Sequence, residues 1–177
     1  MTPPLDRRAV MGAMGALAAA PVLASQSAVA RETAMPRLYP VLMAVIEAWH
    51  HQDIDGVLAH VTDDIVWRNS SGFAPAIKGK AAMRKALEGM APVIKTNKWR
   101  IFDHAENENR LFMEGVDEFW LKTGEHVAIP YAGSLEFRGL LIHEWREYFD
   151  GRISSAMKAG EPMSAEVTEM LNRPVAK

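Results

Sequence analysis

Two acidic residues, Asp117 and Glu147, lie in apolar stretches where a pair of carboxylates could perform acid/base chemistry. Alternate side chains of a β-strand share a face, which places each acid in an apolar row: Trp145, Glu147 and Phe149 in one, and Met113, Gly115, Asp117, Phe119 and Leu121 in the other. Burial raises the pKa of a carboxyl group and a second carboxylate nearby raises it further, which yields a general acid and a general base near neutral pH. The alternative is that both acids are solvated on the outer face of a sheet, or pair with lysine or arginine.

Composition limits the class of protein. The chain has 177 residues, of which 49% are hydrophobic, and a formal net charge of -2, as expected for one globular domain with a substantial core. It lacks the basic excess that binding of nucleic acid requires. The absence of cysteine excludes disulfides, thiolate nucleophiles and cysteine-ligated metals. Carboxylates, histidines, hydroxyls or a bound cofactor must therefore carry any chemistry.

The first thirty residues have the pattern of an export signal. Arg7 and Arg8 precede a weakly apolar run over residues 9–24, and Ala28-Val29-Ala30 has the small-x-small pattern of a cleavage site. The paired arginines and the weak hydrophobicity resemble a twin-arginine signal. We expect a mature protein that begins near Arg31 and is periplasmic or secreted, without a membrane anchor after cleavage.

The remaining chain, residues 31–177, has the pattern of a single α+β domain. Apolar spacing predicts helices at residues 38–50, 54–61 and 80–90, with a short final helix at 164–171. Alternation predicts strands at 64–69, 98–104, 110–122, 126–137 and 141–150, and residues 70–79 are expected to form a loop. Helices first and strands afterwards indicate helices on one side of a curved, largely antiparallel sheet.

Three segments together resemble a known family. Trp67-Arg68-Asn69, Glu114-Gly115-Val116-Asp117 and the hexapeptide from Trp145 to Asp150 are similar to segments of limonene-1,2-epoxide hydrolases, over residues 41–150. That family belongs to the nuclear transport factor 2-like, or SnoaL-like, superfamily. The resemblance implies a cone-shaped curved antiparallel sheet, packed with N-terminal helices around a deep pocket for a small hydrophobic substrate. It also implies a homodimer and a reaction without metal or organic cofactor.

The resemblance implies hydrolysis of an epoxide to a diol by direct attack of water. Glu147 would be the base that activates the water, Asn69 an amide that holds it, and Asp117 the acid that protonates the epoxide oxygen. The expected pocket residues are Trp67, Gly115, Phe119, Trp145 and Phe149. Two positions depart from the family, since Trp67 stands in place of a tyrosine and Gly115 in place of the arginine that bridges the two acids.

Those departures leave alternatives open. Without a guanidinium, Asp117 and Glu147 would repel each other unless another cation reaches them or they share a proton. A shared proton also suits an isomerase, a dehydratase or a lyase acting on a hydrophobic substrate. A periplasmic carrier of an apolar ligand is a third possibility, because a pocket can persist without catalysis. Neither His50-His51 nor His143-Glu144 has the spacing of a metal site.

We predict that export removes about thirty residues, the length of the signal pattern described for such peptides. Mass spectrometry of protein expressed in a bacterial host with the twin-arginine system should detect a mature chain that begins near Arg31. Replacement of Arg7 and Arg8 by lysine should retain the full-length chain in the cytoplasm. Cytoplasmic full-length protein from the unaltered chain would contradict the prediction.

Overall fold

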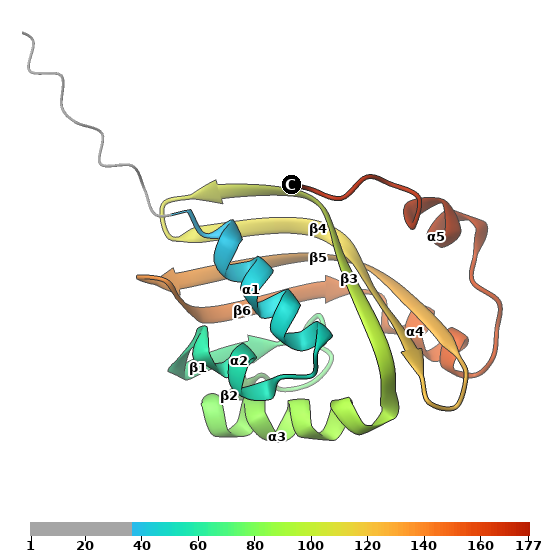
Figure 1. Cartoon of the computed structure of the whole chain (residues 1–177), viewed down its shortest axis with the longest axis horizontal. Helices are drawn as coiled ribbons and strands as arrows, with labels where there is room; N and C mark the ends of the chain where they lie inside the picture. The colour runs from blue at the N-terminus through green and yellow to red at the C-terminus, as the bar shows by residue number, and fades with distance from the viewer. Residues whose placement is uncertain (1–36) are drawn as a thin grey trace, which may run out of the picture. The chain divides into compact units, whose positions relative to one another are not determined.

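The chain forms its helices first and its main sheet afterwards, as the sequence predicts (Figure 1). The computed structural model describes residues 37–177, and the predicted export signal at residues 1–30 lies outside them. The elements are α1 (Tyr39–His50), α2 (Ile54–Ala59), β1 (Val61–Arg68), β2 (Ile77–Lys78), α3 (Lys80–Met90), the 3-10 turn η1 (Ala91–Val93), β3 (Ile94–Asn107), β4 (Arg110–Leu121), β5 (His126–Arg138), β6 (Leu141–Phe149), α4 (Gly151–Lys158) and α5 (Ala165–Met170).

Six strands form one curved, unclosed sheet in the order β2-β1-β6-β5-β4-β3. The predicted α+β class is confirmed, and β3 to β6 form the expected antiparallel meander. The sheet is largely antiparallel, as expected, with one exception: β1 runs parallel to β6. No hairpin joins these two strands, so their relative direction is free of the constraint that a tight turn imposes.

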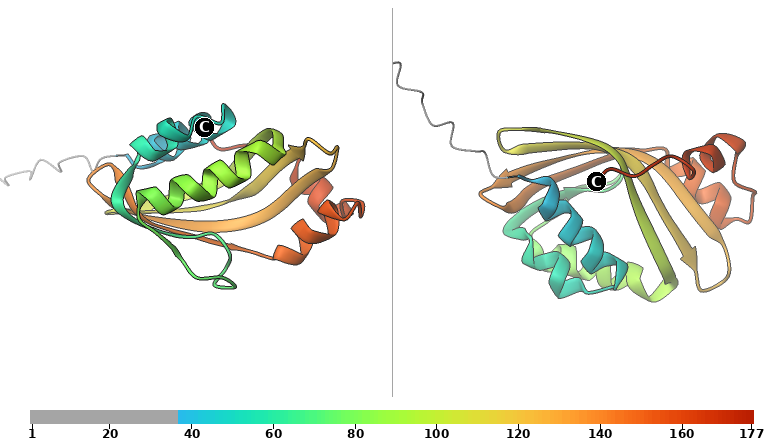
Figure 2. Two further views of the ribbon diagram at one scale, coloured as in Figure 1. Left: turned by 90° about the horizontal axis from the view of Figure 1, so that it is seen from below. Right: turned by 45° about the horizontal axis from the view of Figure 1, so that its top comes forward.

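Helices α1, α2 and α3 cover the concave face of the sheet (Figure 2). The predicted apolar stripe of α1 is buried there, at Leu42, Val45, Ile46 and Trp49. The first turn of α1 has no cap from its own segment. Instead, the carboxylate of Glu106 on β3 accepts hydrogen bonds from the backbone N–H groups of Leu38 and Tyr39, at 3.0 and 2.7 Å, which satisfies donors that a helix leaves free.

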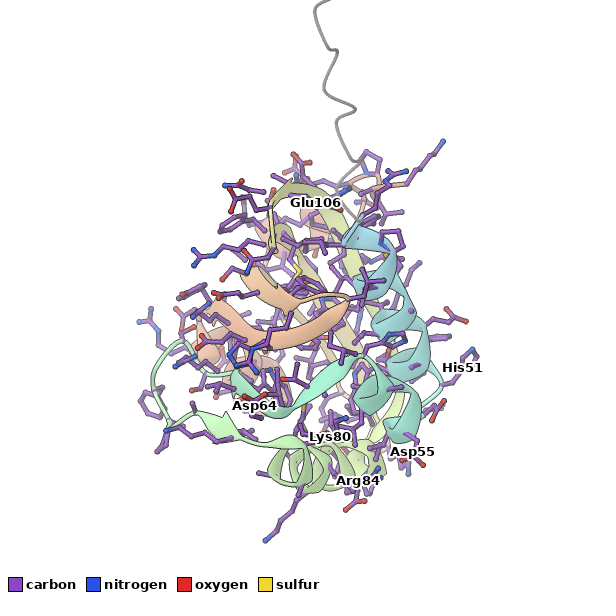
Figure 3. The ribbon with its side chains drawn as sticks, turned by 90° about the vertical axis from the view of Figure 1, so that its left-hand side faces the viewer. His51, Asp55, Asp64, Lys80, Arg84 and Glu106 are labelled. Carbon is purple, nitrogen blue, oxygen red and sulfur yellow. The ribbon has the colours of Figure 1, made fainter. Side chains whose placement is uncertain are left out.

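Charged side chains lie on the outside of the helical layer, where Figure 3 shows Asp55 and Arg84 close together. Arg84 of α3 donates a hydrogen bond to Asp55 of α2, and Lys80 lies 3.0 Å from a carboxylate oxygen of Asp63 on β1. These contacts join neighbouring elements at the surface. Because exposed ion pairs each contribute at most about 1 kcal/mol, the buried apolar contacts hold the layer to the sheet.

Helix α4 was not predicted from the sequence. Asp150 begins it as an N-cap, since its side chain accepts a hydrogen bond of 2.9 Å from the backbone N–H of Arg152. Glycine and serines in its first turns weaken the helical pattern. The helix follows β6 directly and lies at one end of the sheet (Figure 1). Met157 of this helix is buried, and its sulfur atom accepts a hydrogen bond from the backbone N–H of Ala128 on β5.

The segment after α5 returns to the edge of the sheet. The backbone N–H of Ala176 donates to the carbonyl of Ile101 on β3 at 2.8 Å, and the hydroxyl of Tyr39 donates to the carbonyl of Ala176 at 3.5 Å. Arg173 pairs with Glu114 at 2.6 Å and lies over the ring of Phe102. The last residues therefore connect the edge strand to α1.

A bulge in β3 explains the glycine at position 115. The register between β3 and β4 shifts between Ile101 and Asp103, opposite Gly115 and Glu114. A Cβ atom added at Gly115 would collide with the carbonyl oxygen of Arg100, a backbone atom that no side-chain rotation can move away. Position 115 therefore has no room for any side chain, and the arginine of the epoxide hydrolases cannot stand there.

We predict that Gly115→Ala lowers the free energy of unfolding by about 2 kcal/mol or more, because the methyl group forces the two strands apart. Urea denaturation would measure the effect. The matched control is Gly89→Ala, since a Cβ atom at this position of α3 meets nothing within 4 Å, and alanine in a helix should stabilise by up to about 1 kcal/mol. Equal stability of Gly115→Ala and the unaltered protein would contradict the close approach.

Candidate active site

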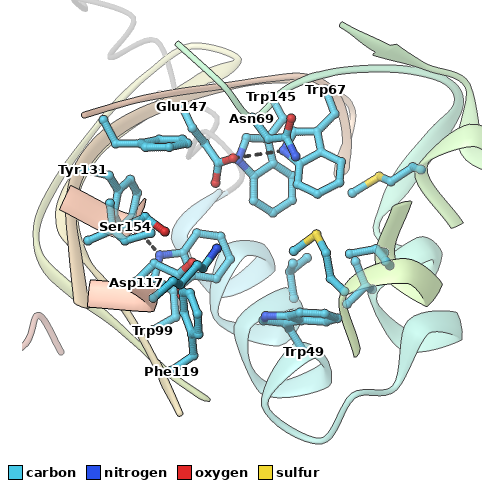
Figure 4. Close-up of a pocket in the computed structure, with 18 residues that line it drawn as sticks. Trp49, Trp67, Asn69, Trp99, Asp117, Phe119, Tyr131, Trp145, Glu147 and Ser154 are labelled. Carbon is cyan, nitrogen blue, oxygen red and sulfur yellow. Dashed lines mark hydrogen bonds between the residues drawn. The ribbon is translucent and has the colours of Figure 1, made fainter. Parts of the chain in front are cut away.

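A cavity of about 280 Å³ lies between the concave face of the sheet and the helices (Figure 4). Four of the five tryptophans line it, with polar groups at a few positions only. Its lining comprises Val45, Trp49, Val57, Trp67, Asn69, Met83, Leu87, Met90, Trp99, Asp117, Phe119, Ile129, Tyr131, Trp145, Glu147, Phe149, Ser154 and Lys158. An apolar cavity with a few convergent polar groups is typical of small-molecule sites.

The predicted site residues gather at this cavity with one exception. Asn69, Asp117 and Glu147 border it, and so do four of the predicted pocket residues: Trp67, Phe119, Trp145 and Phe149. Gly115 is the exception, because it is buried against β3 and has no side chain to present. Its expected place in the pocket lining is corrected accordingly.

Strand register explains why these side chains converge. Trp67 on β1 is directly paired with Trp145 on β6, and Trp99 on β3 with Asp117 on β4. Glu147 faces Gly133 on β5. The alternation of side chains then turns all of them to the concave face, where the curved sheet brings the ends of their rows together.

Asp117 lines the cavity, and the pKa of its carboxyl group is raised. Burial raises the pKa of Asp117 to about 6, and the positive charge of Lys158 on α4 acts in the opposite direction. No hydrogen bond from another described residue contributes to the shift. An ionised Asp117 would therefore be poorly solvated, which is the condition of a reactive base.

Glu147 is perturbed more strongly. Burial and then the negative charge of Asp117 raise its pKa to about 8, whereas the nearby indole N–H groups of Trp67 and Trp145 act in the opposite direction. The indole N–H of Trp67 donates to Oε2 of Glu147 at 3.1 Å. Near neutral pH, Glu147 therefore holds a proton while Asp117 does not, although the two groups titrate as a coupled pair.

Tyr131 on β5 adds a hydroxyl group to the cavity. It lies on the concave face, whereas His126 on the opposite face pairs with Glu118 at 2.9 Å. The phenol oxygen of Tyr131 accepts a hydrogen bond from the indole of Trp99. Burial, and then the charges of Glu147 and Asp117, hold the pKa of Tyr131 well above its ordinary value, so the hydroxyl keeps its proton as a donor.

Trp145 has an indole N–H without a hydrogen-bond partner among residues 37–177. The residue is 3% exposed and lines the cavity. It lies close enough to Glu147 to lower the pKa of that residue. A buried donor without a partner is costly, so a bound polar group or a slight rotation of Glu147 would stabilise this wall.

Three residues that line the cavity escaped the sequence-based prediction for identifiable reasons. Trp99 lies in a strand that was predicted, but an aromatic side chain in a strand does not by itself distinguish a cavity wall from the core. Ser154 and Lys158 lie on α4, whose helix was not predicted. Capping by Asp150 is the local signal that could have found α4. Among the described residues, no three histidine or acidic side chains are grouped as metal ligands would be, and no helix is long and apolar enough to cross a bilayer.

Comparison with known proteins identifies the family. The family model of the SnoaL-like domain matches residues 42–145, which covers more than half of the chain and includes β1 to β5. This chain belongs to the SnoaL-like domain family. The match confirms the superfamily that the three sequence segments predicted, and no curated protein matches the chain in sequence.

Solved structures share the SnoaL-like fold at low identity. An epoxide hydrolase of the limonene type from M. tuberculosis is 22% identical, covers 75% of this chain and 90% of its own, and has a TM-score of 0.59. A Shewanella denitrificans protein described as a SnoaL-like polyketide cyclase is 14% identical, with a TM-score of 0.62 over 71% of this chain and 99% of its own.

A third relative, a Catenulispora acidiphila protein with a ketosteroid isomerase-like fold, is 18% identical, with a TM-score of 0.61 over 72% of this chain and 95% of its own. At these identities the likeness shows the fold alone. The superfamily includes enzymes such as epoxide hydrolases and cyclases.

We predict that Glu147→Gln stabilises the protein above pH 8. The pKa of Glu147 in the folded protein lies at about 8, above the ordinary 4.5. Wild-type stability is therefore fully present below the unfolded pKa and falls as pH rises through the folded pKa, while glutamine does not titrate. Denaturant unfolding should show the variant gaining on the order of 2 kcal/mol relative to wild type between acidic and alkaline pH.

The control is Glu161→Gln, which alters an exposed glutamate outside the cavity. Its effect on the free energy of unfolding should stay nearly constant over the same pH range. A difference between Glu147→Gln and wild type that does not grow with pH would show that Glu147 ionises normally.

Proposed function

We propose that this protein hydrolyses a small, largely apolar epoxide to a diol, with Asp117 as the general base and Glu147 as the general acid. The observation that carries the proposal is the unequal ionisation of two carboxyl groups in one aromatic cavity, with pKa values of about 6 and about 8. Near neutral pH one group can accept a proton while the other can donate one. The cavity of about 280 Å³ is of a size to hold the reacting part of a small apolar substrate.

Lys158 replaces part of what the absent arginine would supply. The bridging arginine of the epoxide hydrolases has no room at Gly115. Lys158 borders the same cavity from α4, and its charge lowers the pKa of Asp117. Lys158 therefore increases the difference between the pKa values of the two carboxyl groups, because it favours the ionised form of Asp117. It does so without bridging the two groups.

The reaction balances with these groups alone. Asp117 accepts a proton from a water molecule while the water oxygen forms a bond to an epoxide carbon. The bond from that carbon to the epoxide oxygen breaks, and the oxygen takes the proton of Glu147. Exchange with solvent then removes the proton from Asp117 and returns one to Glu147. The hydroxyl of Tyr131 can donate to the developing alkoxide, with its oxygen oriented by Trp99.

This assignment exchanges the roles that the family resemblance implies, in which Glu147 is the base. The exchange rests on the different charges that act on the two buried groups, since the negative charge of Asp117 raises the pKa of Glu147 while the positive charge of Lys158 lowers that of Asp117. Asn69 borders the cavity but makes no side-chain hydrogen bond within residues 37–177. Its amide is available to hold the water or the substrate.

Isomerisation of a carbonyl compound is the second candidate. Tyr131 and protonated Glu147 supply two O–H donors that could stabilise an enolate oxygen, and Asp117 could remove a proton from the adjacent carbon. This arrangement needs no activated water. The absence of a side chain at position 115 favours it, because the site then lacks the arginine that bridges the two acids in the epoxide hydrolases.

We predict that Asp117→Asn and Glu147→Gln each lower kcat of a hydrophobic epoxide such as styrene oxide by roughly a hundredfold or more, the scale of a lost general acid or base. For wild type, kcat/KM should rise through pH about 6 as Asp117 ionises and fall through pH about 8 as Glu147 loses its proton. Lys158→Gln should move the acidic limb to higher pH, because Asp117 loses the cation that lowers its pKa.

Single-turnover hydrolysis in ¹⁸O-labelled water should place the label in the diol without prior incorporation into the protein. Glu161→Gln should retain full activity. Rearrangement of a carbonyl substrate, with no diol from any epoxide, would support the isomerase candidate. Ligand binding unchanged in both carboxylate variants, with no reaction of either kind, would identify a carrier.

A further inference from the structure

A second cavity, of about 480 Å³, adjoins the proposed active site. Five residues line both cavities: Trp49, Met90, Asp117, Phe119 and Lys158. The remaining lining comes from the segment around η1 and from the end of β4: Pro92, Val93, Ile94, Leu121, Lys122 and Thr123. A substrate that reacts between Asp117 and Glu147 can therefore extend into this second space.

Two lysines distinguish the second cavity. Lys122 and Lys158 line it, and neither has an ion-pair partner within 4.0 Å among residues 37–177. Apart from Asp117 the lining carries no acidic side chain. The nearby Glu125 already accepts a hydrogen bond from Thr123. The second cavity thus combines apolar walls with two cations that are available to an anion.

Lys158 acts on Asp117, but this effect does not explain why a second lysine, Lys122, lines the cavity. Lys158 acts on the pKa of Asp117 and lies 5.5 Å above the ring of Phe119. Lys122 contributes nothing to that pKa. Its backbone N–H donates to the carbonyl of Val93 at 3.0 Å, which fixes the start of the β4–β5 turn beside η1. The Lys122 side chain is exposed at the cavity and has no ion-pair partner among residues 37–177, so its ammonium group can bind a carboxylate.

We propose that the substrate is an elongated apolar molecule ending in a carboxylate, which Lys122 and Lys158 bind in the second cavity while the reacting part lies between Asp117 and Glu147. The inference rests on the proposed function for the position of the reacting part. It adds a class of substrate, an apolar carboxylic acid. Both lysines line the cavity and are also exposed to solvent, so a carboxylate can reach their ammonium groups while the apolar part of the molecule lies in the cavity.

Binding of ω-phenylalkanoates, compared with their uncharged amides of the same shape, tests the proposal. Tryptophan fluorescence is a direct readout, because Trp49 lines both cavities. Wild type should bind the best carboxylate of the series roughly tenfold more tightly than its amide, and salt at about 0.5 M should remove most of this preference. Equal affinities for acid and amide throughout the series would overturn the proposal.

Lys122→Gln should reduce the preference for the carboxylate severalfold and leave binding of the amide unchanged. Lys85→Gln is the matched control, because Lys85 is exposed on α3 and lines neither cavity. Lys158→Gln is best measured in an Asp117→Asn background, which removes its influence on that carboxyl group. A preference that survives both lysine substitutions would also overturn the proposal.

The same measurements separate this inference from the proposed function. A preference for carboxylates that depends on the lysines, without turnover of any epoxide or carbonyl compound, would support the second cavity and contradict the enzyme. Turnover of neutral epoxides, with no gain in kcat/KM when the substrate carries a carboxylate, would support the enzyme and contradict the second cavity.

Discussion

Desolvation of two like charges in one cavity is the constraint on which the rest of the site depends. Asp117 and Glu147 project from different strands into a space walled by tryptophans, and no arginine is among the described residues that line it. Both cannot ionise without a large electrostatic cost. The environments of the two groups differ, with the cation of Lys158 near Asp117 and indole N–H groups near Glu147. In the proposed mechanism this asymmetry gives two similar groups different chemical roles.

The outer face of the sheet shows how the same fold treats a buried acid that has no catalytic part. Glu118, the residue after Asp117, points to the opposite face and is 3% exposed. Arg100 and His126 each contact one of its carboxylate oxygens at 2.9 Å. Two neighbouring acids on one strand are therefore buried on opposite faces, one fully paired and the other left reactive. Pairing, and not burial alone, separates a structural carboxylate from a candidate catalytic one.

Much of the architecture could be read from the sequence because it depends on local periodicity. The boundaries of α3 match the predicted 80–90, and strand alternation placed Asp117 and Glu147 on one concave face. Long-range relations escaped prediction. The parallel β1–β6 pair, and the approach of Lys158 to Asp117 from α4, depend on residues far apart in the chain. The order of the two pKa values follows from those contacts, so the sequence alone could not assign acid and base.

The edges of the sheet carry a consequence for association with other chains. One edge strand, β2, has only two residues. The other, β3, contains a bulge, and the carbonyl of its Ile101 accepts a hydrogen bond from the backbone N–H of Ala176. A long, flat and unpaired edge is a template on which another molecule can add a strand. At one edge β2 is too short for this, and at the other the bulge and the hydrogen bond from Ala176 interrupt β3. Growth of the sheet from molecule to molecule, the route to amyloid-like aggregation, is thereby obstructed at both ends, and contact between copies is left to the faces of the sheet and the helices.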